Sequence, residues 1–192
     1  MNHITTDIGS YGEWCDSSDT HHYHDASLCK ALTELFLNRG VLSVADFGCG
    51  DASYVRAFAS VGISIFAVDG NPHTPRITGG LGEVQNLALP LDTKLNYDVV
   101  LSLEVGEHIP PEFEQVFIDN LCNTARQQIV MSWAVEGQVG HGHVNCRNND
   151  YIISELTRRG WIYDDEATSS FRAASSLSWF PNSLLVFEKN YD

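Results

Sequence analysis

Basic side chains are scarce in this sequence of 192 residues, which has 11 lysines and arginines against 25 aspartates and glutamates and a formal net charge of −14. The few basic residues gather only weakly, at Arg158 and Arg159 with Arg147 nearby. A surface this acidic repels phosphate backbones over the ~8 Å screening length of physiological salt. Nucleic acid is therefore disfavoured as a substrate, and small, neutral or cationic molecules are easier partners.

The sequence also lacks the marks of export, membrane insertion and disulfide bonding. No stretch approaches the roughly 18 apolar residues of a membrane span, and the first residues carry neither the basic region nor the apolar run of a secretory signal. The five cysteines form no C-x-x-C pair and are odd in number. We therefore expect reduced thiols in a cytoplasmic compartment and no membrane association.

What the chain does have is enough apolar residues, 43% of the total, for one globular core. No linker rich in proline, glycine or serine divides it. Residues 1–24 are polar and aromatic and cannot form a core alone, so we expect them to pack over a main domain of residues 25–192. Their notable side chains are Tyr11, Trp14, His21, His22, Tyr23 and His24.

Strand-like and helix-like segments alternate along the main domain. Asp25 suits the N-cap of a first helix and Gly40 suits the position after its end. The alternation predicts an α/β fold with a parallel sheet and an antiparallel addition near the C-terminus. Expected helices cover 26–39, 52–60, 111–122 and 149–159; expected strands cover 41–46, 63–69, 83–87, 97–103, 129–133, 161–164 and 183–188, the last two separated by an irregular stretch.

A glycine-rich turn follows the first predicted strand. Gly48 and Gly50 let the backbone approach a ligand closely, and the next helix offers free amides. A dinucleotide-binding turn would carry a third glycine where Ser53 stands. Asp46 would repel a pyrophosphate but could hold the amino group of a methionine moiety, and Asp69 is placed to accept the hydroxyls of a ribose.

Three segments together resemble the successive motifs of class I S-adenosylmethionine-dependent methyltransferases. They are Asp46-Phe47-Gly48-Cys49-Gly50, Val68-Asp69, and Asp-Val-Val-Leu-Ser-Leu-Glu-Val-Gly-Glu-His at 98–108. The resemblance implies a Rossmann-like, doubly wound, three-layer αβα fold. Its sheet would have seven mostly parallel strands and end in a C-terminal antiparallel hairpin.

The same resemblance implies a set of residues that bind S-adenosylmethionine. Asn86 stands where a polar side chain, usually aspartate, meets the adenine, and the 102–104 segment would line the methionine end. The N-terminal segment would act as a lid that shields the sulfonium from water. The expected cofactor-binding residues are Trp14, Asp46, Gly48, Cys49, Gly50, Asp69, Gly70, Asn86, Ser102 and Glu104.

The Glu-x-x-Glu-His sequence at 104–108 adds a candidate metal site. A helical turn there would put Glu104, Glu107 and His108 on one face. The pattern is similar to that of small-RNA 3′-terminal 2′-O-methyltransferases and of ubiquinone-pathway O-methyltransferases. This similarity implies that Glu104, Glu107, His108 and His143 hold Mg²⁺ or Mn²⁺. Many methyltransferases resembling this chain carry the same motif without a metal, so both alternatives stay open.

The loop 137–145 carries the remaining candidates for chemistry. His141 and His143, together with His108, could serve as the general base, because an imidazole titrates near neutral pH. A flexible surface loop is the plainer alternative. Trp133, Trp161 and Trp179 are expected in the core or in hairpin packing, with a pocket wall formed by Trp179, Phe180 and Pro181 as the alternative.

The sequence thus predicts an S-adenosylmethionine-dependent methyltransferase that acts on oxygen or nitrogen of a small-molecule or peptide acceptor. One alternative is metal-assisted 2′-O-methylation of RNA, which the charge disfavours. Another is a regulatory protein that binds S-adenosylmethionine without transferring methyl. A nicotinamide-dependent oxidoreductase is a third, and the missing glycine at position 53 argues against it.

Overall fold

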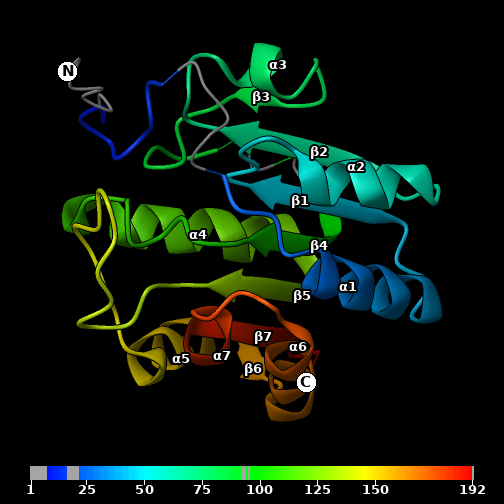
Figure 1. Ribbon diagram of the computed structural model, residues 1–192. Helices are drawn as coiled ribbons and strands as arrows, with labels where there is room; N and C mark the ends of the chain where they lie inside the picture. The colour runs from blue at the N-terminus through cyan, green and yellow to red at the C-terminus, as the bar shows by residue number, and fades with distance from the viewer. Residues whose placement is uncertain (1–7, 17–21, 92–93, 95, 192) are drawn as a thin grey trace.

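A seven-stranded sheet forms the centre of the protein, seen in a computed structural model that describes residues 8–16, 22–91, 94 and 96–191. The strand order is β3-β2-β1-β4-β5-β7-β6, and β7 runs antiparallel to both of its neighbours (Figure 1). The strands are β1 (Ser43–Phe47), β2 (Ser64–Asp69), β3 (Glu83–Val84), β4 (Tyr97–Ser102), β5 (Ala125–Ser132), β6 (Trp161–Tyr163) and β7 (Leu184–Lys189). The predicted fold, a mostly parallel sheet with a C-terminal antiparallel addition, is confirmed.

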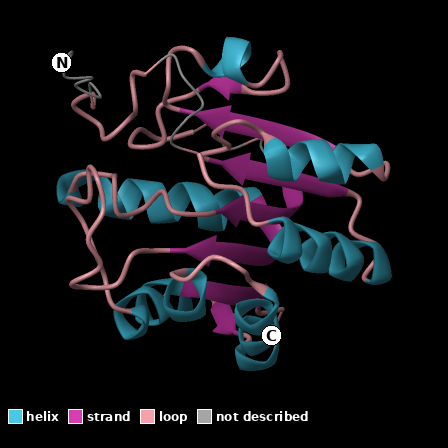
Figure 2. Ribbon diagram, in the orientation of Figure 1, coloured by secondary structure: helices cyan, strands magenta, loops and turns pink. Residues whose placement is uncertain are grey.

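Helices cover both faces of this sheet and give three layers (Figure 2). On one face the apolar sides of α1 (Ala26–Asn38), α2 (Ser53–Ser60) and α6 (Asp165–Ala174) pack against β1, β4 and β7. On the other face α4 (Glu114–Thr124) and α5 (Asn149–Thr157) pack around the buried ring of Trp133. Shorter pieces are α3 (Thr74–Ile77), a 3₁₀ turn (Pro111–Phe113) and α7 (Phe180–Ser183).

Three predicted elements differ from the structure. The stretch between the last two strands, expected to be irregular, contains α6 and α7; the side chain of Asp164 caps α6 by accepting a hydrogen bond from Ala167 N. Only Thr168 and Phe171 of α6 are buried, and the helix is mostly polar, so few apolar residues mark it in the sequence. The third strand pairs over two residues only, and the helix expected from Pro111 begins as a 3₁₀ turn.

The parallel strands β1, β2, β4 and β5 all end at one edge of the sheet, the left edge in Figure 1. After β1 the chain continues to β2 on one side of β1, whereas β4 lies on the other side. The connections therefore diverge, and a crevice opens between the strand ends. The described residues of the N-terminal segment, 8–16 and 22–24, lie across this edge. No helix among the described residues is long and apolar enough to span a bilayer.

At the other end of the sheet, where the parallel strands begin, a buried carboxylate joins three strands. Asp98, 1% exposed, accepts hydrogen bonds from the amides of Leu42 and Ser43 at 2.8 and 3.0 Å, and it pairs with Arg126. Burial raises the pKa of Asp98, but the hydrogen bonds from Arg126 and from these amides outweigh burial and lower it. Asp98 therefore ties the start of β1 to β4 and β5 in its ionised form.

We predict that Asp98→Ala lowers the free energy of unfolding by about 3 kcal/mol at pH 7, because several buried donors lose their acceptor. The difference from wild type should shrink as the pH falls through the lowered pKa, where the native carboxylate is itself protonated. Urea unfolding at several pH values measures this. Asp119→Ala, which removes a carboxylate that is 54% exposed, is the matched control; an equal loss in both variants would contradict the prediction.

Candidate active site

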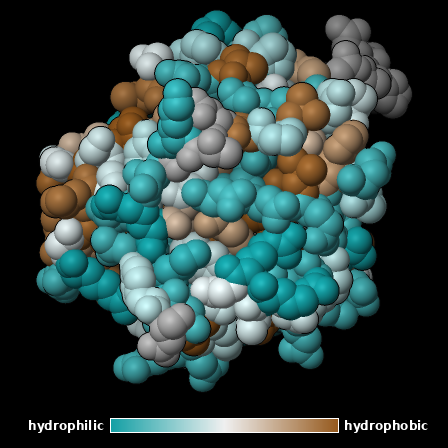
Figure 3. Space-filling view, turned by 180° about the vertical axis from the view of Figure 1, so that it is seen from behind, coloured by the Kyte–Doolittle hydropathy of each residue, from teal (hydrophilic) through white to brown (hydrophobic). Residues whose placement is uncertain are grey.

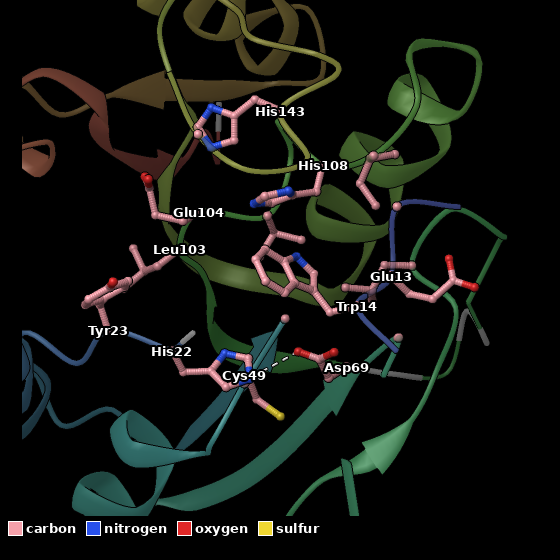
Figure 4. A pocket seen from close by; sticks show the side chains of 18 of the residues that line it. Glu13, Trp14, His22, Tyr23, Cys49, Asp69, Leu103, Glu104, His108 and His143 are labelled. Atoms are coloured by element: carbon pink, nitrogen blue, oxygen red, sulfur yellow. Dashed lines mark hydrogen bonds between the residues drawn. The ribbon is translucent and has the colours of Figure 1, made fainter. Parts of the chain in front are cut away.

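A cavity of about 450 Å³ opens at the carboxyl ends of β1, β2 and β4. Its walls come from the N-terminal segment, the glycine turn after β1, the end of β2, the turn after β4, the loop 138–143 and the start of α7. Figure 4 shows side chains from these segments converging on one space. Its volume falls within the roughly 300–1,000 Å³ of small-molecule sites.

The glycine turn folds back onto the end of β2. The amides of Gly48 and Cys49 both donate to the carbonyl of Val68, at 2.8 and 3.0 Å, and the amide of Gly50 donates to the Asp69 carboxylate at 3.0 Å. Gly48 has φ 88°, and a Cβ there would lie 2.2 Å from the side chain of Val105. Glycine is therefore required at this turn by both backbone conformation and space.

Carboxylates dominate this end of the cavity. Asp46 is 3% exposed, and burial together with repulsion from Asp69 and Asp51 raises its pKa to about 8. Asp69 accepts the amides of Gly50 and Asn71 and still lines the cavity. Among the described residues that line the cavity there is no lysine or arginine. The empty pocket thus concentrates negative charge that a cationic ligand can neutralise.

Nearly all of the predicted cofactor residues meet here. Those lining the cavity are Trp14, Asp46, Gly48, Cys49, Gly50, Asp69, Gly70, Asn86 and Glu104. Ser102 does not line it: the side chain is 1% exposed and its hydroxyl donates to the carbonyl of Phe47. The prediction that Ser102 lines the cofactor site is therefore corrected: β4 ends at Ser102, and the next residue, Leu103, lines the cavity instead.

Glu104 occupies a strained position in the turn after β4. Its φ of 56° lies in the left-handed region, where a residue with a side chain is seldom found. Ser132 Oγ accepts from the Glu104 amide and donates to its Oε1, each at 2.7 Å, and Ser183 Oγ donates to the same oxygen at 3.3 Å. Burial raises the pKa of this carboxyl. The expected turn therefore starts only after Glu104, where the amides of His108 and Ile109 donate to the carbonyls of Val105 and Gly106. Glu104 itself is held by β5 and α7.

The turn and the loop 138–143 instead bring Glu107, His108 and His143 together. Each offers a ligand atom within 4.8 Å of the others. Glu107 is fully buried, neither of its carboxylate oxygens has a hydrogen-bond partner among the described residues, and His143 Nε2 lies 4.0 Å from its Oε1. Burial, followed by repulsion from Glu104, raises the pKa of Glu107 well above its usual range.

Backbone carbonyls orient two of the imidazoles. His108 Nδ1 lies 3.2 Å from the carbonyl of Gly142, and His143 Nδ1 lies 3.1 Å from that of Gln138. A carbonyl can only accept, so in each ring Nδ1 carries the proton and Nε2 keeps its lone pair. Burial, followed by repulsion from His143, lowers the pKa of His108 to about 4. His141 is exposed, with its ring edge-on to Trp14 at 5.5 Å.

The described part of the N-terminal segment covers the cavity. Trp14 packs edge-on against His108, with ring centroids 5.7 Å apart, as Figure 4 shows. Gly12 passes so close to the backbone of His108 that a Cβ would lie 1.9 Å from its carbonyl oxygen. His22 sits over Gly50, where a Cβ would meet its Nδ1 at 2.7 Å. His21 lies outside the described residues.

Several lining residues were not predicted from the sequence. Glu13, Tyr54 and Gln138 line the cavity, and nothing in their local sequence indicates it. Trp133 and Trp161 are buried as expected, while Trp179 and Phe180 form a wall of the cavity. Tyr23 and Trp179 meet edge-on at 5.7 Å, although they are far apart in sequence.

Comparison with solved structures identifies the fold. A structure of magnesium protoporphyrin IX methyltransferase from Synechocystis PCC 6803 with bound SAM superimposes on 84% of this chain and 78% of its own chain, with a TM-score of 0.66 and 19% identity. This chain therefore has the class I methyltransferase fold. The sugar N-methyltransferase KedS8 from Streptoalloteichus sp ATCC 53650 is also similar, with a TM-score of 0.68, 10% identity and coverage of 86% and 87% of the two chains.

Sequence comparison gives a weaker signal. The ubiquinone biosynthesis O-methyltransferase, mitochondrial, of Schizosaccharomyces pombe is 27% identical in an alignment 127 residues long, which covers 57% of this chain and 45% of that protein. The chain therefore spans less than half the length of this curated relative. No family model matches the sequence.

We predict that Gly12→Ala detaches the 8–16 segment from His108, because the added methyl would overlap a backbone carbonyl that cannot move aside. Acrylamide quenching of tryptophan fluorescence should increase as Trp14 becomes accessible. Gly40→Ala is the control, since Gly40 also has a positive φ but no atom lies within 4 Å of its Cβ position. Equal quenching in both variants would contradict the close packing described above.

Proposed function

We propose that the protein is an enzyme that transfers a methyl group from S-adenosylmethionine to oxygen or nitrogen of a small-molecule or peptide acceptor. The observation that carries this proposal is the placement of Asp46 and Asp69 at the ends of adjacent strands, on either side of the glycine turn and in one cavity. The curated relative, an O-methyltransferase, supports the same chemistry.

The cofactor contacts follow from these positions. Asp69 accepts the ribose hydroxyls, Asn86 meets the adenine, and Gly48, Cys49, Gly50 and Gly70 lie along the cofactor. Asp46 lies where it can pair with the amino group of the methionine moiety. The N-terminal lid, residues 1–24, closes over the sulfonium through Trp14. A dinucleotide fits less well, because its pyrophosphate would lie against carboxylates with no basic side chain among the described lining residues.

Catalysis in this site depends mainly on alignment. The sulfonium carries its own leaving group, so an acceptor held in line and shielded from water reacts rapidly, with effective molarities on the order of 10⁵ M. An acceptor hydroxyl also loses a proton. The free Nε2 atoms of His108 and His143, and the ring of His141, are the groups that can accept it.

A divalent metal ion is a further part of the proposal, with Glu107, His108 and His143 as its ligands. The residues fit: the Glu107 carboxylate accepts no hydrogen bond from the residues that the structure describes, and both imidazoles point their Nδ1 atoms at carbonyls, as metal-binding histidines do. Such an ion, Mn²⁺ or Mg²⁺, would lower the pKa of an acceptor hydroxyl when bound. Glu104 is held by Ser132 and Ser183 and lies outside the three-residue cluster.

Metal ligation and proton acceptance compete for the same Nε2 lone pairs. If His108 and His143 hold an ion, neither can act as the base, and His141 alone remains. Chelation separates the two mechanisms, because activity that survives a chelator leaves His108 and His143 free to act as bases.

The acceptor is best sought among small neutral or cationic molecules. Described side chains lining the cavity include carboxylates, histidines and aromatic rings but no fixed positive charge. The face seen in Figure 3 is mainly hydrophilic, with apolar side chains in small separate groups. RNA 2′-O-methylation would require a basic binding surface and a steep salt dependence. A reducing compartment such as the cytoplasm fits the five cysteines, none of which forms a disulfide in the part of the chain that the structure describes.

Incubation with methyl-labelled S-adenosylmethionine and panels of amines, phenols, peptides and RNA tests the activity. Label in a small molecule or peptide supports the proposal, and label in RNA alone overturns its acceptor class. Tight cofactor binding without transfer to any acceptor would favour a regulatory role. Stabilisation by NAD(H) and not by S-adenosylmethionine in thermal shift would favour an oxidoreductase.

We predict that S-adenosylmethionine binding at pH 7 releases up to one proton from Asp46. With a pKa of about 8 the empty-site carboxyl is mostly protonated at pH 7, and the incoming ammonium favours the ionised form. Affinity should therefore rise as the pH approaches 8. Calorimetry in buffers of different ionisation enthalpy measures the released proton.

Asp46→Asn should abolish this proton release and weaken cofactor binding at least about tenfold, since a charge-assisted contact is lost. It should also stabilise the ligand-free protein at pH 7 by up to about 4 kcal/mol. The Asp46 carboxyl is ionised at pH 7 in the unfolded chain but must take up a proton on folding, because its folded pKa is about 8, and asparagine avoids this cost. Asp165→Asn on the exposed start of α6 is the control. Unchanged affinity in Asp46→Asn would exclude the ammonium contact.

We predict that Mn²⁺ binds the purified protein and stabilises it by about 2.7 kcal/mol at a hundred times its dissociation constant. Glu107→Gln should remove the effect, because it deletes the only carboxylate of the three-residue cluster. Glu136→Gln, an exposed carboxylate of the neighbouring loop, is the matched control. Thermal unfolding with Mn²⁺, Mg²⁺ and Zn²⁺ measures this, and no stabilisation by any of them would rule out the metal.

A further inference from the structure

Asp25 makes two sets of hydrogen bonds, of which only one belongs to its helix. Oδ1 accepts the amides of Ser27 and Leu28 at 3.1 and 3.0 Å, as an N-cap does, and also the hydroxyl of Ser176 at 2.9 Å. Oδ2 accepts only from a segment about 150 residues away: Ser175 Oγ at 2.7 Å, Ser176 N at 2.7 Å and Leu177 N at 2.9 Å. Asp25 is fully buried. Capping α1 requires none of the Oδ2 contacts.

Asp25 is connected to two parts of the cavity wall, to one along the chain and to the other through its hydrogen bonds. Residues 22–24 precede it and residues 179–180 follow the segment that it binds, and both groups line the cavity. We call these residues the outer wall. Their rings meet, with Tyr23 edge-on to Trp179 at 5.7 Å, and Figure 4 shows Tyr23 near Leu103 and apart from Trp14. The two halves of the outer wall are thus joined at the rings and at Asp25.

The backbone of Asp25 fixes a third lining residue. Its amide donates to the hydroxyl of Tyr54 at 3.2 Å, and the ring of Tyr54 packs against His24 at 4.9 Å. Tyr54 follows the glycine turn in α2 and lines the cavity. Asp25 therefore also connects the outer wall to the helix that carries the cofactor turn.

Beyond Trp179 the connection reaches Glu104. The carbonyl of Trp179 accepts a hydrogen bond from the amide of Ser183 at 3.2 Å, and it lies 3.2 Å from the Ser183 hydroxyl, which donates to Glu104 Oε1 at 3.3 Å. The indole Nε1 of Trp179 is buried and has no acceptor among the described residues. A bound molecule can supply that acceptor.

We propose that Asp25 is a positioning residue: its carboxylate binds the 175–177 segment and thereby holds the outer wall, Tyr23 against Trp179, in place around the bound cofactor and acceptor. This rests on the proposed function, which supplies the ligands. Although burial raises the pKa of Asp25, the hydrogen bonds from Leu28, Ser175, Leu177 and Ser176 hold it well below its usual range. The carboxylate therefore stays charged at all working pH values.

Asp25→Asn separates the two functions of the side chain. The amide oxygen of asparagine can still cap α1, since asparagine is as good an N-cap as aspartate. The amide nitrogen donates, so it cannot accept the N–H groups of Ser176 and Leu177. Asp164→Asn is the matched control, because Asp164 caps α6 in the same way and does not line the cavity.

The readout is the dissociation constant of S-adenosylhomocysteine, measured by calorimetry on the full chain. We expect Asp25→Asn to raise it at least about tenfold, the scale of losing charge-assisted hydrogen bonds, and Asp164→Asn to change it less than about twofold. Equal values for the two variants would overturn the proposal. A wild-type protein that does not bind S-adenosylhomocysteine would overturn the proposed function itself, which is a distinguishable result.

A double-mutant cycle with Trp179→Ala tests whether Asp25 acts through the outer wall. With the ring removed, adding Asp25→Asn should change the dissociation constant less than about twofold, because there is no longer a wall to position. A full tenfold effect in the Trp179→Ala background would overturn the proposal, since Asp25 would then act by another route.

A milder variant covers the case in which Asp25→Asn does not fold. Ser175→Ala combined with Ser176→Ala removes two hydroxyl donors to Asp25 and leaves the carboxylate, its helix cap and the backbone amides intact. We expect a rise of at least about threefold in the dissociation constant. An unchanged value in this folded variant would overturn the proposal.

Discussion

The site depends on one backbone interaction, the folding of the glycine turn onto the end of β2. Two successive amides, of Gly48 and Cys49, share the carbonyl of Val68, and the third, of Gly50, binds Asp69. These bonds bring the end of β1 and the end of β2 into one wall. Asp46 in β1 and Asp69 in β2 thus line one cavity, because the parallel pairing of the two strands and the turn between them act together.

Bringing these carboxylates together is unfavourable in the empty protein. Asp46 responds by holding a proton, which is why its pKa is raised to about 8. Burial and repulsion from Glu104 likewise raise the pKa of Glu107, which lies close to the imidazoles of His108 and His143. A positive charge beside either carboxyl would favour its ionised form. Carboxyl groups perturbed in this way are typical of sites shaped for a ligand.

Much of the fold could be predicted because it depends on local patterns. The buried runs of β1, β4 and β5, the capped helix α1 and the glycine turn are visible in short windows of sequence. Predictions failed where an element depends on distant partners. Helix α6 buries only two residues. Ser102 is buried and hydrogen-bonded to the backbone of β1, whereas its neighbour Leu103 lines the cavity. Glu104 adopts a left-handed backbone because Ser132 and Ser183 hold it.

The sequence by itself determined the order of strands and helices, the glycine turn and the acids beside it, because these depend on residues close together in the chain. Only the tertiary structure decided which side chains share the cavity. It brought ligand atoms of Glu107, His108 and His143 within 4.8 Å of one another and bound Glu104 beside them to Ser132. It also revealed that Asp25 binds a segment about 150 residues away. Such contacts depend on how the crossovers of the sheet return the chain to one edge, and local sequence does not encode that distance.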